Sequence, residues 1–207
     1  MKNTDYFKLL TTEIHSVVIA TVDKNGLPSS RVIDIMLYDE KGIYFLTAKG
    51  KFFYDQLISK PYVSVCGITS GKNSMKRKSL CITGAVKNIG INKLDKIFEV
   101  NPYMKEIYPT PESRTALEVF CMYKGQGFYF DLSKKPIIRE DFSFGGINLK
   151  KYGYQISDNC NSCGLCLTKC PQDCIETGKP FKIIQKNCLH CGNCMEICPV
   201  NAVLKLG

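Results

Sequence analysis

The sequence predicts a mainly β domain followed by a small α+β domain. Two observations lead to this prediction. Apolar runs separated by Asp/Asn-rich tetrapeptides that end in glycine fill the first part of the chain, and such a pattern is typical of hairpins. Nine of the twelve cysteines lie between Cys160 and Cys198. We therefore assign residues 1–140 to the first domain, 141–152 to a connector and 153–207 to the second domain, since 207 residues suffice for two small cores.

The first domain is predicted to be a small antiparallel barrel with helices outside it. The turns DKNG and DEKG, at 23–26 and 39–42, separate its first strands, and Pro61 ends its first helix. The Gly-rich stretch KGQG at 124–127 is predicted to be the turn of a last hairpin. Strands are expected over residues 16–22, 30–38, 43–47, 62–69, 80–86, 119–123 and 128–132, and helices over 51–59 and 92–100.

The second domain contains an internal repeat. Residues 160–171 read CNSCGLCLTKCP and residues 188–199 read CLHCGNCMEICP, so the same cysteine spacing occurs twice, 28 residues apart. Each copy is followed by a short apolar run, which predicts a pseudo-twofold pair of loops with small flanking strands. Soft thiolate ligands suit an iron–sulfur cluster, with Zn²⁺ as the main competitor. Zinc ribbons use two well-separated CxxC pairs, which is a different pattern.

These two runs resemble those of bacterial two-cluster ferredoxins, over residues 153–207. The resemblance implies two 4Fe–4S clusters, with the fourth cysteine of each run ligating the cluster of the other run. The ligands it implies are Cys160, Cys163, Cys166 and Cys198 for one cluster and Cys188, Cys191, Cys194 and Cys170 for the other.

Two residues of the cysteine-rich domain stay open between alternatives. Cys174 is either an alternative cluster ligand or a small buried side chain in the apolar run, and the second is expected. His190 either tunes or ligates a cluster or is an exposed loop imidazole between two ligands, and again the second is expected.

The first domain offers a cationic set at the ends of predicted strands. Arg31, Lys49 and Lys51 are its members, and AKGK at 48–51 opens the predicted helix. Fixed positive charge and the backbone N–H groups of a helix start are what a phosphate requires. The alternative is a solvated turn with ordinary surface lysines.

The segments VVIATVDKNGLPSSRV at 17–32 and IYFLTAKGK at 43–51 are similar to the pyridoxamine 5′-phosphate oxidase-like, FMN-binding split-barrel family, over residues 5–132. The resemblance implies phosphate contacts from Arg31 and Lys51, assisted by Lys49, and a homodimer with FMN at its interface. Ser79 stands where family oxidases place a glutamine. Strand residues along the flavin would be Arg31, Val32, Ile33 and Asp34, then Leu46, Thr47 and Ala48. The family's C-terminal arginine and tryptophan have no counterpart, so its vitamin-oxidase activity is not carried over.

Composition and net charge indicate the kind of partner and the cellular compartment. There are 28 Lys and Arg against 19 Asp and Glu, giving a net charge of +9 and suggesting an anionic partner. No apolar run is long enough to span a membrane and no secretory signal is visible, so a reducing cytoplasm is expected. The basic loop at 72–78 has no interleaved aromatics, so a solvated loop or a docking surface for an acidic redox partner is favoured over nucleic-acid binding.

The combined pattern predicts a flavin/iron–sulfur oxidoreductase that passes electrons between the clusters and FMN to reduce a small-molecule acceptor. Two alternatives are an electron-transfer module that serves a partner enzyme and a redox sensor, neither with a substrate of its own.

Overall fold

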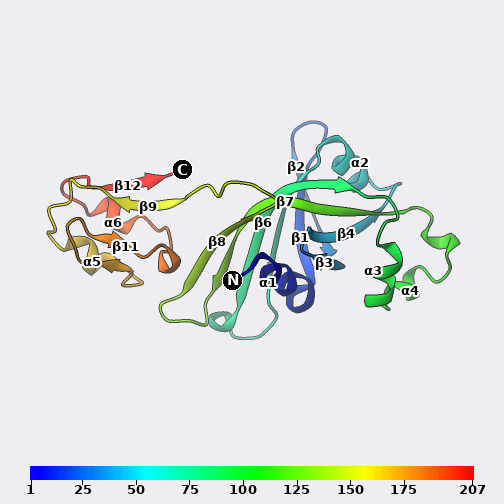
Figure 1. Cartoon of the computed structure of the whole chain (residues 1–207), viewed down its shortest axis with the longest axis horizontal. Helices are drawn as coiled ribbons and strands as arrows, with labels where there is room; N and C mark the ends of the chain where they lie inside the picture. The colour runs from blue at the N-terminus through cyan, green and yellow to red at the C-terminus, as the bar shows by residue number, and fades with distance from the viewer. The chain divides into compact units, whose positions relative to one another are not determined.

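The apolar runs of the first domain form one eight-stranded sheet in the computed structural model, which describes residues 1–207 (Figure 1). The strand order is β2-β1-β5-β6-β7-β4-β3, and β8 pairs with β7, so the sheet has one strand more than the seven expected. The strands are β1 Ser16–Val22, β2 Pro28–Asp34, β3 Leu37–Asp39, β4 Gly42–Ala48, β5 Tyr62–Ile68, β6 Lys78–Asn88, β7 Leu117–Asp131 and β8 Ile138–Phe144.

Both predicted hairpin turns are confirmed. Between β1 and β2, the Asp23 carboxylate accepts hydrogen bonds from two backbone N–H groups of the turn, and Gly26 has φ +85°. Between β3 and β4, Asp39 accepts from the N–H of Lys41 at 2.8 Å, and Gly42 has φ +145°. Glycine is needed at these positions because other residues rarely adopt a positive φ.

The strand predicted over 30–38 is interrupted, so that prediction is wrong. β2 ends at Asp34 and β3 begins at Leu37. In between, the Ile35 N–H donates to the carbonyl of His15, and the Met36 N–H donates to the carbonyl of Tyr44. The chain therefore pairs with β1 up to Asp34 and with β4 from Leu37 onward.

The predicted hairpin at KGQG is also wrong, because β7 runs without a break through it. A Cβ on Gly125 would lie 2.7 Å from the Thr83 carbonyl oxygen, and one on Gly127 would lie 2.3 Å from that of Cys81. A Cβ on Gly84 of β6 would likewise lie 2.5 Å from the Lys124 carbonyl oxygen. The glycines therefore allow β6 and β7 to approach closely, which is the other common reason for glycine in a strand.

The helices of this part are short, and all except α1 and η1 lie between strands in the sequence. They are α1 Asn3–Lys8 with the π-helical η1 Leu9–Ile14, α2 Phe52–Ser59, α3 Leu94–Val100, α4 Met104–Ile107, and the 3₁₀ turns η2 Ser74–Lys76 and η3 Glu112–Arg114. The helices predicted over 51–59 and 92–100 are confirmed as α2 and α3. Two aromatic residues of the segment expected to be a connector pack on α1: Phe142 stacks on Tyr6, and Phe144 meets Phe7 edge-on.

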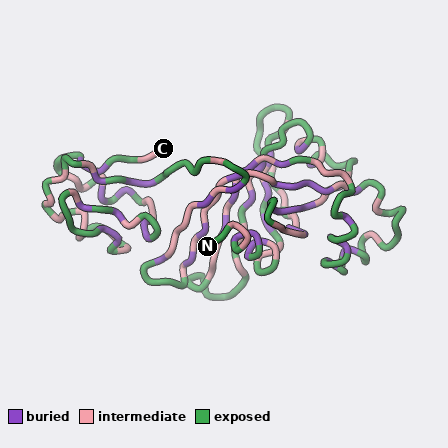
Figure 2. The backbone as a smooth tube through the Cα atoms, viewed as in Figure 1, coloured by how far each residue is buried: buried purple, intermediate pink, exposed green.

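Buried side chains lie on both faces of the sheet at β4 and β7, since consecutive residues of these strands are buried. Buried residues are concentrated on the strands, whereas the loops are largely exposed (Figure 2). Phe45 stacks between Phe53 of α2 and Phe120 of β7, and Ile19 and Leu57 are also fully buried. Each such side chain contributes roughly 1.5–3 kcal/mol through burial. No helix is long and apolar enough to cross a membrane.

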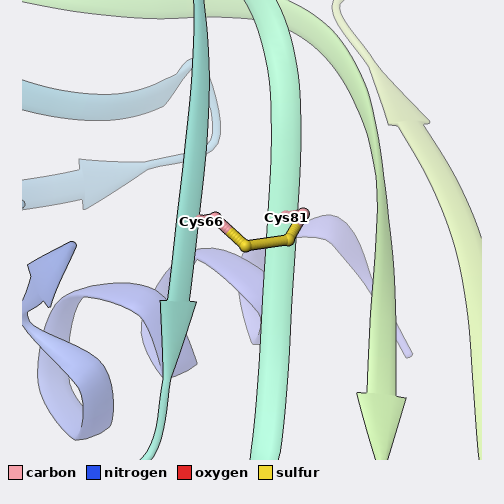
Figure 3. Close-up of a disulfide and its surroundings, with 2 residues drawn as sticks. All are labelled: Cys66 and Cys81. Atoms are coloured by element: carbon pink, nitrogen blue, oxygen red, sulfur yellow. A yellow bond between two sulfur atoms is a disulfide. The ribbon is translucent and has the colours of Figure 1, made fainter. Parts of the chain in front are cut away.

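Two of the three cysteines that precede residue 160 form a disulfide. Cys66 of β5 and Cys81 of β6 lie directly opposite each other in the antiparallel register, with Cα atoms 4.2 Å apart (Figure 3). The same cross-strand row continues to Val18 of β1 and Val32 of β2. No sequence pattern indicated this pair, because the register of two strands is needed to find it. Cys121 is free and buried.

The chain divides into two compact units. The first holds residues 1–70, 79–128 and 142–147, and the second holds residues 71–78, 129–141 and 148–207. The cysteine-rich part of the second unit has two small antiparallel pairs, β9 with β12 and β10 with β11. Its elements are β9 Gly153–Ile156, α5 Leu165–Lys169, β10 Ile175–Glu176, β11 Lys182–Ile183, η4 Gln185–Asn187, α6 Asn193–Glu196 and β12 Val203–Leu206. The expected flanking strands after each cysteine run are therefore present as β10 and β12.

Candidate cofactor sites

Four cysteines line one cavity in the cysteine-rich domain. Three come from the first run and the fourth from the end of the second run: Cys160, Cys163, Cys166 and Cys198. This is the grouping that crossed ligation requires. Pro199 and Ala202 also line the cavity, and its remaining wall is largely apolar.

The other four predicted ligands line a second cavity: Cys170, Cys188, Cys191 and Cys194. Here three sulfurs come from the second run and one from the first. No three His, Cys, Asp or Glu side chains of the chain are close enough to hold a single ion. A four-iron cluster needs separated thiolates, because each of its irons takes a different one. Thiolate donors in two apolar cavities fit such clusters.

The two copies of the repeat have the same backbone geometry. Gly164 and Gly192 have φ +83° and +84° and begin α5 and α6. Two residues before each glycine, Ser162 and His190 both have φ +58°. The bends that turn each loop around its cavity are therefore repeated at a spacing of 28 residues.

The structure corrects the expectation for His190 and extends the expectation for Cys174. His190 is half-buried rather than exposed, and its imidazole packs on Gly153, where a Cβ would lie 2.6 Å from Nε2. Burial lowers the pKa of His190, with a further lowering from Arg139. Cys174 is buried, as expected, but it also lines the second cavity.

In the barrel, Arg31 is held by neutral partners only. Its guanidinium donates to Thr21 Oγ1 at 2.6 Å, Ser29 Oγ at 2.6 Å and Gln56 Oε1 at 2.9 Å. It also lies over the Phe53 ring, 4.5 Å from the centroid. Burial lowers the pKa of Arg31, yet an arginine stays charged at neutral pH. The result is an oriented, half-buried cation without a carboxylate partner, which suits a phosphate.

The start of α2 lies beside this cation, because Phe53 and Gln56 belong to that helix. Lys51 precedes it as the N-cap residue, is exposed, and leaves the helix start without a side-chain cap. Thr47 shares a face of β4 with Phe45, since side chains alternate along a strand. The Thr47 hydroxyl is buried and has no hydrogen-bond partner. An unpaired buried hydroxyl is costly, so a bound polar group is a reasonable partner for it. These residues fit a phosphorylated cofactor such as FMN.

Lys49 is directed elsewhere. Its ammonium lies 3.3 Å from Glu118 Oε1 of β7. Glu118 also accepts hydrogen bonds from Tyr54 and Asn88, and these bonds together with Lys49 lower its pKa. The expected phosphate contact from Lys49 requires that it leave this network.

The remaining predicted flavin residues are spread over the sheet. Val32 is 67% exposed on the face opposite Arg31, and Ile33 is half-buried on the face of Arg31. Leu46 and Ala48 pack against the cluster that includes α3, on the opposite face of β4 from Thr47. Ser79 is on β6, three strands from β2 and thus roughly 14 Å away at the usual spacing. The structure does not bring Ser79 to Arg31.

Asp34 belongs to a polar cluster that no sequence pattern indicated. Ser16 Oγ and the Tyr103 hydroxyl donate to its carboxylate, each at 2.6 Å. His15 Nε2 lies 3.5 Å from the same carboxylate and 3.2 Å from the Tyr103 hydroxyl oxygen. Burial opposes ionisation of Asp34, but these hydrogen bonds and His15 outweigh it and lower its pKa. Burial and the bond to Asp34 raise the pKa of Tyr103.

The fold and the cysteine cavities together define a split barrel joined to a ferredoxin-type domain. Residues 4–122, more than half of the chain, match the model of the pyridoxamine 5′-phosphate oxidase family, and the chain belongs to that family. Residues 159–202 match a 4Fe-4S dicluster domain, which is therefore present at the C-terminal side.

The chain is similar to several pyridoxine/pyridoxamine 5′-phosphate oxidases. It is 32% identical over 92 residues to the protein from Escherichia fergusonii, covering 44% of this chain and 40% of that protein. It is 32% identical over 111 residues to the one from Ectopseudomonas mendocina, covering 51% and 48% respectively. The chain thus spans less than half the length of these relatives.

Solved structures with the same fold include a NimC/NimA family protein from Clostridium acetobutylicum, with a TM-score of 0.53 at 20% identity, covering 67% of this chain and 96% of that one. PhzG from Burkholderia lata has a TM-score of 0.51 at 15% identity, covering 68% and 81%. At such identities the likeness establishes the fold alone. The family and the dicluster domain together support a role in redox chemistry and electron transfer.

Proposed function

We propose that this chain is an FMN-dependent reductase that passes electrons between two 4Fe–4S clusters and FMN and reduces a small-molecule acceptor. The observation that carries the proposal is the pair of cavities, each surrounded by four cysteines, in a chain of an FMN-binding family. The clusters carry single electrons, and a flavin takes them up singly and delivers them as a pair. Joining both sites in one chain raises the effective concentration of donor at acceptor.

The barrel residues would hold the FMN phosphate at the start of α2. Arg31 is already oriented by Gln56 and Phe53, so little side-chain entropy is lost on binding. Lys51 adds a second cation, and the unpaired Thr47 hydroxyl adds a hydrogen bond. The family resemblance extends the site along β2 and the end of β4.

We further propose that two copies of the chain pair through the outer face of β2, β1 and β5. This face carries exposed apolar side chains, with Val32 67%, Val18 48% and Ile68 51% exposed. Contiguous apolar surface of this kind is typical of protein interfaces. Sedimentation at micromolar concentration should give a dimer, and a monomer that retains flavin would overturn this part.

The basic loop favours a second candidate, an electron-transfer module for a partner enzyme. Lys72 and Lys76 are exposed and form no ion pair, so the loop keeps its positive charge available for an acidic redox protein. Turnover of a small acceptor by the isolated chain separates the reductase from this module and from a redox sensor.

Anaerobic purification followed by iron, sulfide, zinc and flavin analysis tests the cofactors directly. We expect about eight irons and eight sulfides per chain from two sets of four thiolates, and FMN bound when it is supplied. Stoichiometric zinc without labile sulfide would contradict the clusters. A folded 1–150 fragment that binds no FMN in excess would contradict the flavin site.

A further inference from the structure

Cys174 has no role in the proposed function, and the repeat allows it to be compared with the equivalent residue of the other copy. The repeat spacing of 28 residues places Cys174 and Ala202 at equivalent positions, four residues after Cys170 and Cys198. The backbone agrees, since the preceding residues, Asp173 and Asn201, have φ +48° and +49°. The N–H of Cys174 donates to Cys170 Sγ at 3.4 Å, and the N–H of Ala202 donates to Cys198 Sγ at 3.2 Å.

The two positions differ only in the side chain, and that difference is a sulfur atom. Ala202 is fully buried and lines the first cavity, so a methyl group is enough to pack this position. Cys174 is 3% exposed and lines the second cavity. Its Sγ lies 3.4 Å from Cys170 Sγ, in hydrogen-bond contact. The second cavity therefore has five thiols where the first has four.

A fifth thiol at this distance is within reach of the iron that Cys170 would hold. Cysteine sulfurs move between staggered rotamers, and such a change shifts Sγ over a distance comparable to this separation. A purely apolar role would not direct the sulfur at a ligand, because the equivalent alanine fills the same space without one. Packing alone therefore does not account for a sulfur in contact with Cys170 Sγ at this position.

We propose that Cys174 is a reserve ligand of the second cluster, able to take the place of Cys170 on its iron; this rests on the proposed presence of that cluster. In the exchange, the bond from iron to Cys170 Sγ breaks and a bond to Cys174 Sγ forms. The proton of the Cys174 thiol passes to the Cys170 sulfur, so no electron is gained or lost and no further reactant is needed. The first cluster has no such reserve.

The test compares Cys170→Ala with Cys198→Ala in the anaerobically purified full chain. Iron and sulfide per chain are measured together with the electron paramagnetic resonance spectrum of the reduced protein. Cys170→Ala should keep about eight irons, because Cys174 completes the four thiolates. Cys198→Ala should fall to about four irons, by loss of the first cluster.

Two double variants make the result specific. Cys170→Ala/Cys174→Ala should lose iron as Cys198→Ala does, whereas Cys198→Ala/Ala202→Cys should recover about eight irons by moving the reserve to the first cluster. Equal iron loss in Cys170→Ala and Cys198→Ala would overturn the proposal, as would full iron content in Cys170→Ala/Cys174→Ala. A wild-type chain without clusters would instead overturn the proposed function, so the two failures are distinguishable.

Discussion

The cluster cavities and the cationic site of the barrel are assembled in different ways. Each cavity takes three sulfurs from a seven-residue stretch such as Cys160–Cys166, with one more from the other copy of the repeat. The barrel site takes Arg31 from β2, Thr21 from β1 and Gln56 from α2, so distant segments must meet before the cation is oriented. In the cavities, loss of a ligand should remove a whole cofactor. In the barrel, loss of one side-chain contact should weaken FMN binding without abolishing it.

The largest effect is expected at the cavities. Cys163→Ala should remove the first cluster and Cys191→Ala the second, each costing about four of eight irons, because each removes one of the four thiolates that the cluster requires. Iron and sulfide analysis with absorption spectra checks this. Cys121→Ala, at a buried free cysteine of the barrel, is the control and should keep both clusters. Loss of both clusters in either ligand variant would show that the cavities do not fill independently.

The second effect concerns the flavin phosphate. Arg31→Ala should weaken FMN binding by about one to two decades, since a charge-assisted hydrogen bond contributes roughly 1.5–3 kcal/mol. Lys51→Ala should act in the same direction. Flavin fluorescence titration measures the affinity while cluster absorbance stays unchanged.

Lysines of the same charge provide the controls. Lys72→Ala, in the basic loop, should leave FMN affinity unchanged. Lys49→Ala should change FMN affinity by no more than about threefold, because the ion pair with Glu118 holds the Lys49 ammonium away from the phosphate site. Equal losses in all four variants would mean that only general charge matters, and the site would lose its support.

A smaller effect is expected at Thr47, which tests whether its unpaired hydroxyl has a partner in the bound cofactor. Thr47→Val keeps the shape and removes a neutral hydrogen bond of about 0.5–1.5 kcal/mol, so FMN affinity should fall about two- to tenfold. Without FMN, the variant should be as stable as the wild type or slightly more so, because the buried hydroxyl is unpaired. Thr47→Ser is the matched control. Unchanged affinity in Thr47→Val would place the cofactor elsewhere.

The smallest effect is on stability. Asp34→Asn should destabilise the barrel by about 1 kcal/mol at neutral pH, after allowance for its partial exposure. Because the pKa of Asp34 is lowered in the folded state, its contribution is complete above the unfolded pKa of about 3.9 and is lost as pH falls through the folded value. The gap to the wild type should therefore shrink as the pH falls below about 4. Thermal unfolding of matched cluster-free samples measures it, and a gap that grows as the pH falls below about 4 would contradict the hydrogen-bonded carboxylate.

The same contrast explains what could be predicted from the sequence. The cysteine cavities follow from spacing, because CxxCxxC brings its sulfurs together through local turns at Gly164 and Gly192. The pairing of Cys66 with Cys81 and the joining of His15 and Tyr103 to Asp34 depend on strand register and on contacts between distant segments. A local pattern does not contain that information.

The glycines show most clearly what a local sequence pattern does not reveal. The turns at Gly26 and Gly42 were predictable, because each follows an acidic residue that binds the turn backbone. KGQG is also a glycine-rich stretch between apolar runs, but no acidic residue precedes its glycines. Gly125 and Gly127 instead allow a close approach to β6 within a continuous strand, and the neighbouring strand is needed to recognise this use.

Electron exchange between the cysteine-rich domain and the barrel is the central claim, and rapid anaerobic mixing with a low-potential one-electron donor tests it most directly. The FMN-loaded wild type is compared with Cys163→Ala/Cys191→Ala, which should bind FMN but hold no clusters. We predict that flavin reduction in the wild type is at least about tenfold faster than in the double variant, since the clusters deliver single electrons from within the same chain. Equal rates of flavin reduction in the two proteins would contradict the account.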